Sequence, residues 1–381
     1  MNNILKKIEC IMTGKKKAGL ISFESLLFML SLIYGGAVKI RETFYNKGVL
    51  RSKKLPCLVI SIGNITVGGT GKTPMTIYVA ELVKCMGYKV VVISRGYKGL
   101  AEKTGGIVSD GKTIFMKPDE SGDEPFMVAV RLKNIPVVVG KNRFNAGMMA
   151  FNSFHPDVIV LDDAYQHLKL KRDIDLVLLD KEYPFGNNNQ LPRGTLREPI
   201  SSLMRSDAII LTRSDNTSNM EEESSFLQFK KYTCGKPVFK AIHTPKIYKI
   251  IKGKDIISDK TSTHSFDLLQ GQKVFAFSGI AQNSDFRHVV EGLNCELKGF
   301  TEFPDHHSYS NNDLYNLLQL SGKLKVDFVL TTEKDYVKIA DRVTWPVDLV
   351  VIDVNISFGN YDAAFDNFIK NKLDELVKNK K

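Results

Sequence analysis

A glycine-rich run that ends in lysine and threonine is the strongest chemical signal in the sequence. It reads Asn64-Ile65-Thr66-Val67-Gly68-Gly69-Thr70-Gly71-Lys72-Thr73-Pro74 and lies between a predicted strand and a predicted helix. Such glycines let successive backbone N–H groups point at phosphate oxygens, and the helix N-terminus adds its dipole. Lys72 would then contact the β- and γ-phosphates of a nucleotide, and the Thr73 hydroxyl would bind Mg²⁺. The expected nucleotide-binding residues are Gly68, Gly69, Thr70, Gly71, Lys72 and Thr73.

The base of that nucleotide is indicated by what the sequence lacks. A guanine-binding protein usually carries [NT]-K-x-D after a strand. The run Thr212-Arg213-Ser214-Asp215 has arginine in place of the lysine, and Thr332-Glu333-Lys334-Asp335 has its lysine one place too late. ATP is therefore favoured over GTP. The strict phosphate-loop pattern would place glycine where Thr66 stands. The assignment therefore depends on the whole context, which is a strand, several glycines, the Lys-Thr pair and a helix in this order.

Two pairs of carboxylates could complete such a site. Asp162-Asp163 follows four apolar residues of a predicted strand, which is typical either of a polar strand end or of Mg²⁺ ligands. Beside a phosphate loop, the ligand interpretation is favoured. Asp123-Glu124 opens a predicted helix, where it could simply complement the helix dipole or could supply a general base or a metal ligand. The spacing leaves both alternatives open.

Two adjacent histidines, His306 and His307, occupy a loop that reads Phe303-Pro304-Asp305-His306-His307-Ser308-Tyr309. Neighbouring side chains on an extended segment point in opposite directions, so one imidazole could face a site but not both. An ordinary surface loop is the alternative. Earlier in the chain, Arg95 ends a predicted strand, and Arg193 and Arg197 belong to a Pro/Gly loop.

These residues must be positioned by alternating strands and helices. Short apolar runs, typical of strands buried on both faces, occur at 57–62, 89–93, 136–139, 158–161, 174–179 and 208–211, with helices suited to 74–86 and 122–132. The pattern predicts a P-loop NTPase core with a doubly wound, mostly parallel α/β sheet. It restarts after residue 235, with strands at 274–277, 328–330 and 349–354. We expect connections at 216–223 and 246–265, a P-loop domain over 51–235 and a smaller C-terminal α/β domain over 236–381.

The first 50 residues form a separate, N-terminal segment. Two lysine- and arginine-rich stretches, residues 1–17 and 39–54, flank the most apolar part of the chain, 18–38. A spanning helix and a helix packed on its own domain are alternatives, but basic flanks favour an amphipathic helix on an anionic membrane surface. The formal net charge of +11 likewise indicates an anionic partner. Single-stranded nucleic acid is not expected, because basic and aromatic residues do not interleave. The five scattered cysteines indicate reduced thiols rather than disulfides or zinc.

Taken together, the motifs resemble the tetraacyldisaccharide 4'-kinase (lipid A 4'-kinase) family. The resemblance rests on the phosphate loop, Ser94-Arg95-Gly96-Tyr97, Gly122-Asp123-Glu124-Pro125, Asp162-Asp163-Ala164-Tyr165-Gln166-His167, residues 191–199, 303–309 and 330–335, in this order. It implies transfer of the ATP γ-phosphate to the 4'-hydroxyl of an acylated disaccharide 1-phosphate, at the cytoplasmic face of the bacterial inner membrane. A soluble P-loop kinase of a small metabolite and a nucleotide-switch NTPase are the alternatives.

The resemblance also implies roles for individual residues. Asp123 would be the catalytic base, with His306, or else His307, as its partner from the second domain. Lys72 would hold the nucleotide phosphates, and Arg197, with Arg95 as a further candidate, would stabilise phosphate charge or hold the substrate phosphate. The residues implied as Mg²⁺ ligands are Thr73, Glu124, Asp162 and Asp163.

Overall fold

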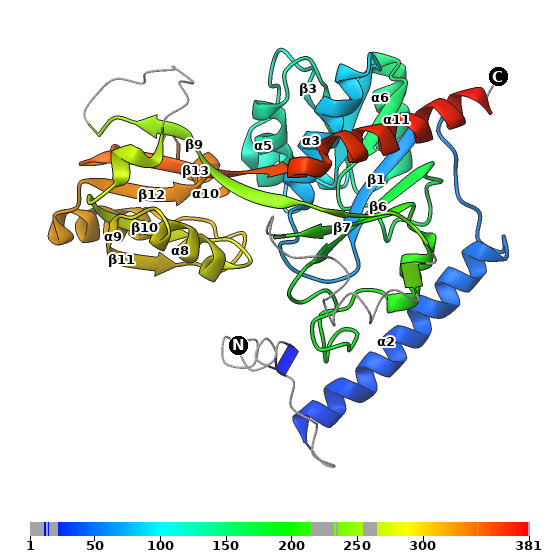
Figure 1. Cartoon of the computed structure of the whole chain (residues 1–381), viewed down its shortest axis with the longest axis horizontal. Coiled ribbons are helices and arrows are strands. Elements are labelled where there is room, and N and C mark those ends of the chain that lie inside the picture. The colour runs from blue at the N-terminus through cyan, green and yellow to red at the C-terminus, as the bar shows by residue number, and fades with distance from the viewer. Residues whose placement is uncertain are drawn as a thin grey trace.

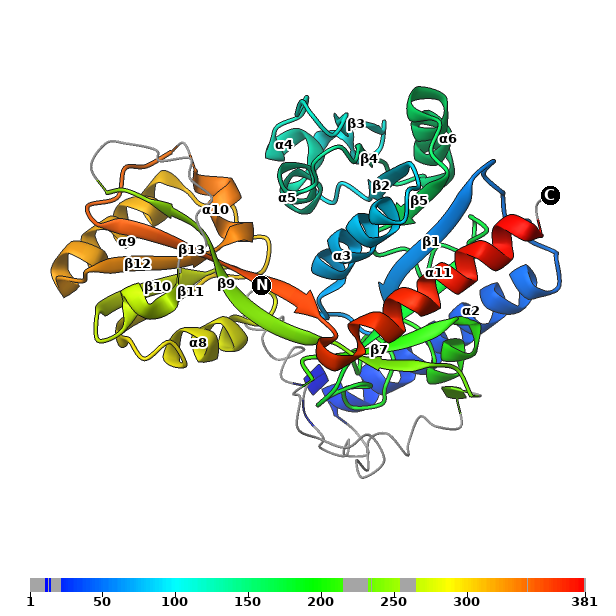
Figure 2. The ribbon, with the colours of Figure 1, turned by 45° about the horizontal axis from the view of Figure 1, so that its top comes forward.

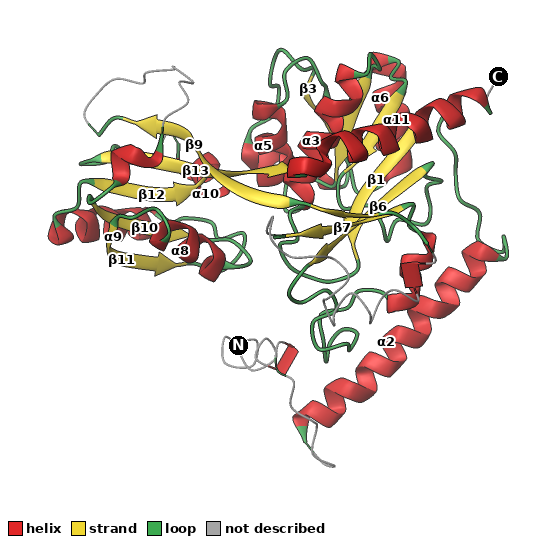
Figure 3. Cartoon of the chain, viewed as in Figure 1, coloured by secondary structure: helices red, strands yellow, loops and turns green. Residues whose placement is uncertain are grey.

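Two α/β domains lie side by side, joined by long strands (Figure 1). The structure, a computed structural model, describes residues 11–12, 14, 22–214, 232–233, 235–253, 265–340 and 342–379. Each domain contains one mostly parallel sheet with helices packed against it (Figure 3). The expected connection at 216–223 and the lysines before residue 18 lie outside the described residues.

The first domain is built on an eight-stranded sheet in the order β3-β4-β2-β5-β1-β6-β7-β8. All neighbouring strands in it are parallel except the β3–β4 pair. The central strand β1 is buried along its whole length, as a continuous apolar run predicts. The strands are β1 (Leu58–Asn64), β2 (Val90–Ser94), β3 (Gly106–Ser109), β4 (Val137–Val139), β5 (Val158–Leu161), β6 (Ile174–Asp180), β7 (Ala208–Thr212) and β8 (Val238–Lys240).

Alternate side chains of the central strands pack in two separate cores, because helices cover both faces of the sheet. Ile60 of β1 packs in the core that includes Met75 of α3, whereas Val59 packs in the core that includes Ala150 of α6. This division is what a doubly wound sheet requires. The helices of this part are α3 (Lys72–Cys85), α4 (Pro118–Ser121), α5 (Asp123–Arg131) and α6 (Arg143–Phe154), with single 3₁₀ turns at Leu100–Glu102 and Ile200–Arg205.

The second domain has a five-stranded sheet in the order β11-β10-β12-β13-β9. Only β9, which pairs with β13, is antiparallel. Aromatic side chains fill one face, where Phe277 stacks on Trp345. The elements are β9 (Ile242–Ile251), β10 (Lys273–Ser278), α8 (Asn283–Glu291), β11 (Glu296–Glu302), α9 (Asn311–Leu324), β12 (Phe328–Thr332), α10 (Glu333–Ile339) and β13 (Asp348–Ser357), with a 3₁₀ turn at Phe266–Leu269.

The structure differs from the expected domain organisation in three respects. Strand β8 belongs to the first sheet, and part of the expected connection at 246–265 is strand β9. The C-terminal helix α11 (Asp362–Lys378), preceded by a 3₁₀ turn at Gly359–Tyr361, packs on the first domain rather than the second (Figure 2). Its Phe365, Ile369 and Leu373 are buried in the core that includes β1. The second domain is thus inserted into the first, because β9 leaves the first domain and β13 returns to it.

The N-terminal helix α2 (Phe23–Asn46) lies along one side of the first domain (Figure 1). It is anchored by a few polar contacts, among them Ser31 Oγ to the Gln190 carbonyl at 2.8 Å and Tyr34 Oη to the Arg197 carbonyl at 2.9 Å. By length and composition alone it could cross a membrane. Its apolar side chains are largely exposed: Leu26, Phe28, Met29, Leu30, Leu32, Ile33, Ile40 and Phe44.

Candidate active site

The glycine-rich run forms the turn between β1 and α3. Gly68 and Gly71 adopt φ values of 118° and 77°, which favour glycine, and Gly71 caps the N-terminus of α3. Asn64 Nδ2 donates a 3.0 Å hydrogen bond to Thr70 Oγ1 and closes the turn from inside. Lys72 and Thr73 follow in the first turn of α3. This is the strand–turn–helix arrangement in which backbone N–H groups and a helix N-terminus receive phosphate.

The two aspartates after β5 meet this loop from the neighbouring strand. Asp162 is buried and accepts hydrogen bonds from Thr76 Oγ1 of α3 at 3.1 Å and Ser94 Oγ at 3.4 Å. Asp163, in the left-handed region at φ 46°, points elsewhere and lies 4.0 Å from Lys72 Nζ. The aspartates therefore have different surroundings, although they are adjacent in the chain.

Arg197 joins Asp163 to the first strand. Its Nη2 lies 2.5 Å from Asp163 Oδ1 and donates to Asn64 Oδ1 at 2.7 Å. The Pro/Gly loop that carries Arg197 is held on the phosphate loop by backbone bonds, Val67 N to Thr195 O at 2.8 Å and Arg197 N to Ile65 O at 2.7 Å. A fixed cation is thereby placed beside Lys72.

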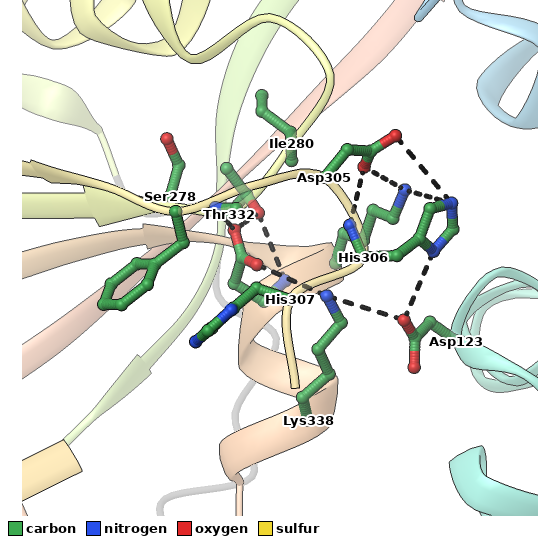
Figure 4. Close-up of polar contacts among 12 residues, drawn as sticks. Asp123, Ser278, Ile280, Asp305, His306, His307, Thr332 and Lys338 are labelled. Carbon is green, nitrogen blue, oxygen red and sulfur yellow. Dashed lines mark hydrogen bonds and ion pairs between the residues drawn. The ribbon is translucent and has the colours of Figure 1, made fainter. Parts of the chain in front are cut away.

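The second acidic pair and one histidine meet between the domains. Asp123 and Glu124 occupy the first turn of α5, after Gly122 at φ 89°. His306, on the loop between β11 and α9, lies 3.6 Å from Asp123 Oδ2 through Nδ1 and 3.9 Å from Glu124 Oε1 through Nε2. The ring of Tyr97 packs edge-on against this imidazole at 5.4 Å. Figure 4 shows His306 between Asp305 and Asp123.

His307 turns away from the carboxylates. Its Nε2 lies 3.1 Å from Asp313 Oδ2, and its ring stacks on Phe303 at 4.6 Å, both within the second domain. The opposite orientation of adjacent side chains, expected from the sequence, is thus what the structure has. It brings His306, not His307, to Asp123.

Two lysines of α10 reach the same cluster, although neither of them was assigned a role in the site from the sequence. Lys334 Nζ lies 3.2 Å from Glu124 Oε1 and 3.0 Å from Asp305 Oδ1. Lys338 Nζ lies 3.5 Å from Asp123 Oδ2 (Figure 4). Their spacing of four residues places both on one face of a helix, which is a usable signal once α10 is known to face the cleft.

These cations keep Asp123 ionised. Burial by itself raises the pKa of Asp123, but the contact with His306 and the charges of Lys338 and Lys334 outweigh it and hold that pKa below its usual value. Lys334 is also buried, yet Glu124 and Asp305 raise its pKa above the ordinary value. An ionised carboxylate is what a proton acceptor requires.

Comparison with known proteins identifies the family. The model of the tetraacyldisaccharide-1-P 4'-kinase family matches residues 23–374. The chain belongs to this family. A tetraacyldisaccharide 4'-kinase of Desulfatibacillum aliphaticivorans is 38% identical over 374 residues, covering 98% of this chain and 99% of that one. One from Aquifex aeolicus is 36% identical over 315 residues, covering 83% and 90%.

A solved structure agrees with the sequence relationship. The crystal structure of LpxK from Aquifex aeolicus in complex with ATP superposes with a TM-score of 0.70 and 31% identity, covering 92% of this chain and all of that one. The family and the P-loop α/β fold predicted from the motifs are therefore confirmed.

In this kinase-family chain, oxygen donors suited to Mg²⁺ gather beside the phosphate loop. Burial, followed by the charges of Glu124 and Asp163, raises the pKa of Asp162 to about 7. A divalent cation would offset that repulsion, so the residues present fit the metal. Within the described ranges no group of three or more His, Cys, Asp or Glu forms a metal cage by itself. The Thr73 hydroxyl, nucleotide phosphates and water would have to complete the coordination.

A cavity of about 640 Å³ adjoins the active site of this kinase-family chain. Helix α2 forms one wall with Tyr34 and Arg41, and Arg197 and Asp163 are shared with the phosphate site. Buried Arg143 donates to the carbonyls of Gly140 and Asp162 at 2.7 and 3.2 Å. The cations that line the cavity outnumber its two carboxylates; they are Arg41, Arg95, Lys141, Arg143, Lys169 and Arg197. The cavity is suited to an anion.

Proposed function

We propose that this chain transfers the γ-phosphate of ATP to the 4'-hydroxyl of a tetraacyldisaccharide 1-phosphate, in lipid A biosynthesis. The observation that carries the proposal is the meeting of Asp123 and His306 across the two domains, beside a phosphate loop. Family membership supports the same reaction. In the transfer, the sugar oxygen bonds to the γ-phosphorus, the bond to the β–γ bridging oxygen breaks, and ADP leaves.

The phosphate loop, Lys72 and Arg197 hold the triphosphate. Both side chains already lie near Asp163, at 4.0 and 2.5 Å, so phosphate oxygens entering there would meet two preorganised cations. Mg²⁺, held by Thr73, Glu124 and Asp162 with Asp163 beside them, would neutralise phosphate charge when bound. Fixed charges that need no reorganisation lower the barrier most effectively.

Asp123 serves as the base that takes the proton of the sugar hydroxyl. His306 and Lys338 keep it ionised, and His306 fixes its orientation. Because His306, Lys334 and Lys338 come from the second domain and Asp123 from the first, the base is complete only when the two domains are in contact. Chemistry that depends on this contact limits attack by water on ATP.

The lipid acceptor enters along α2. The cationic cavity takes the substrate phosphate, with Arg95 and Arg143 among its donors, and the exposed apolar side chains of α2 meet acyl chains and the membrane. The basic N-terminal segment adds attraction to anionic headgroups. We infer that the enzyme works at the cytoplasmic face of the inner membrane, where the acylated substrate resides.

The deciding experiment measures transfer from γ-labelled ATP to tetraacyldisaccharide 1-phosphate in detergent micelles, with and without Mg²⁺. The expected product is a bisphosphorylated lipid that forms only with Mg²⁺. The variant Lys72→Ala removes the cation at the triphosphate and should lower transfer by at least about 100-fold while the fold is kept. Near-normal rates in this variant would refute the phosphate-loop assignment.

Two other outcomes would point elsewhere. Label released only as free phosphate, with no labelled lipid, would favour a nucleotide-switch NTPase. Full activity on a water-soluble acceptor after removal of α2, with none on lipid, would favour a soluble metabolite kinase.

A further inference from the structure

A second contact between the domains lies on the outer side of the phosphate loop and is built around Arg213. This arginine follows β7 in the left-handed region, at φ 58°. Its Nη1 contacts Asp180, at the end of the adjacent strand β6, and its Nη2 donates to the Gly69 carbonyl at 2.7 Å. The guanidinium therefore connects the phosphate loop to the carboxyl ends of strands β6 and β7.

The same guanidinium reaches the second domain. Its Nη2 contacts Gln282 Oε1 and lies 2.7 Å from Asp285 Oδ2, at the start of α8. One side chain thus connects a phosphate-loop carbonyl in one domain with a helix N-terminus in the other. The run 212–215 is close to a guanine-binding motif in sequence, but its Arg213 makes this contact between the domains instead. Asp215, the last residue of the run, lies outside the described residues.

The joining strand touches the loop as well. A Cβ on Gly71 would lie 2.7 Å from Nε2 of His243, in β9, so the loop backbone lies directly against that imidazole. His243 Nε2 is buried and has no hydrogen-bond partner among the residues that the structure describes. Likewise, a Cβ on Gly69 would meet the Ala281 side chain at 3.7 Å. The loop backbone at Gly71 therefore lies against a residue of the joining strand β9, and Gly69 lies close to Ala281 of the second domain.

We propose that Arg213 is a positioning residue that couples the phosphate loop to the second domain. Its bond to the Gly69 carbonyl fixes the orientation of a peptide in the loop that must present N–H groups to phosphate. Its contacts with Gln282 and Asp285 make that orientation depend on where α8 sits. Because coupling between two equilibria is reciprocal, nucleotide binding and docking of α8 stabilise each other.

The inference rests on the phosphate-loop assignment, and its test separates the two. In the full chain in detergent, the double variant Gln282→Ala/Asp285→Ala removes only the second-domain half of the contact and leaves Arg213 on Gly69 and Asp180. It should raise the KM for ATP and the Kd of a non-hydrolysable ATP analogue about three- to tenfold. Hydrogen exchange of α8 amides should slow on analogue binding in the parent protein and not in this variant.

Two single variants complete the test. Arg213→Met should raise both constants more than tenfold, and Arg213→Lys should restore part of the loss. Arg287→Met, on the same helix α8 but in an exposed pair with Glu291 2.9 Å away, is the matched control and should change neither constant.

The proposal is overturned if the double variant binds the analogue like the Arg287→Met control. It is also overturned if Arg213→Met weakens binding but the double variant does not, because Arg213 would then brace the loop within one domain. Should Arg213→Met fail to fold, the double variant still decides. Unchanged analogue binding in Lys72→Ala would instead contradict the phosphate-loop assignment itself.

Discussion

Arg131 is the residue whose replacement tests the contact between α5 and α10 most directly. At the end of α5 its Nη2 contacts the carboxylates of Glu333 in α10 and Asp353 in β13. The side chains are 10%, 3% and 6% exposed, so the charges are almost wholly removed from water. Burial alone would lower the pKa of Arg131, but the two carboxylates outweigh burial and raise this pKa above its usual value.

Arg131→Met should lower the free energy of unfolding by about 3–5 kcal/mol, because it leaves a buried carboxylate without its cation. Asp353 retains Lys246 at 3.4 Å, so the loss falls mainly on Glu333. Replacing that residue too, in Arg131→Met/Glu333→Leu, should recover most of the stability. The turnover number should fall as well, since the same α5 carries Asp123 and Glu124 in its first turn.

The assay is urea unfolding of the full chain in detergent, followed by tryptophan fluorescence. Trp345 is the only tryptophan and is buried in the second domain, so its emission reports that domain directly. Arg287→Met, which removes an exposed pair, is the control and should change stability by no more than about 0.5 kcal/mol. A loss below about 1 kcal/mol for Arg131→Met, or no recovery in the double variant, would refute the reasoning.

Three further outcomes follow from the site. Asp123→Ala should lower the turnover number by about 10²–10⁴-fold with little change in ATP affinity; a loss confined to Mg²⁺-dependent nucleotide binding would show that Asp123 and Glu124 have exchanged roles. Ile33→Glu, at a position of α2 that is 68% exposed, should raise the KM for micellar lipid and leave the turnover number unchanged, whereas an unchanged KM would exclude this face from lipid contact. Burial, with the charge of Arg213, lowers the pKa of His243 to about 4 in the folded protein, whereas the same imidazole has a pKa of about 6.5 in the unfolded chain. As pH falls, the unfolded state therefore takes up a proton before the folded state does. The free energy of unfolding should decrease as pH drops from about 6.5 towards 4. His243→Phe should flatten this pH dependence in urea titrations and His288→Gln should retain it; an equal slope in both would contradict the burial argument.

The sequence could predict the parts of the site that are local in the chain. Gly68, Gly71, Lys72 and Thr73 stand in one turn whose backbone demands and chemistry are written in consecutive residues. Asp162 directly follows the apolar run of β5, which by itself predicts a buried strand. The central strands were found for the same reason, since burial on both faces leaves a continuous hydrophobic signature.

What the sequence could not predict depends on contacts distant in the chain. A lysine such as Lys338 looks like any exposed helical lysine until α10 is known to pack on α5. Strand β9 mixes lysine and isoleucine, a composition that is also typical of a polar connection. It has this composition because it lies at the edge of its sheet and pairs with β13 alone among the described strands. The choice between His306 and His307 likewise required the fold.

The return of the chain to the first domain through α11 has a consequence for biosynthesis. Phe365, Ile369 and Leu373 complete a core most of whose other buried members precede residue 242. Since α11 follows the inserted domain in the chain, the nucleotide-binding domain emerges from the ribosome with one flank of its hydrophobic core uncovered. The inserted domain, continuous from β9 to β13, can become compact earlier. Assembly of the catalytic unit is therefore expected to finish only after the inserted domain has been translated, when α11 docks onto α3.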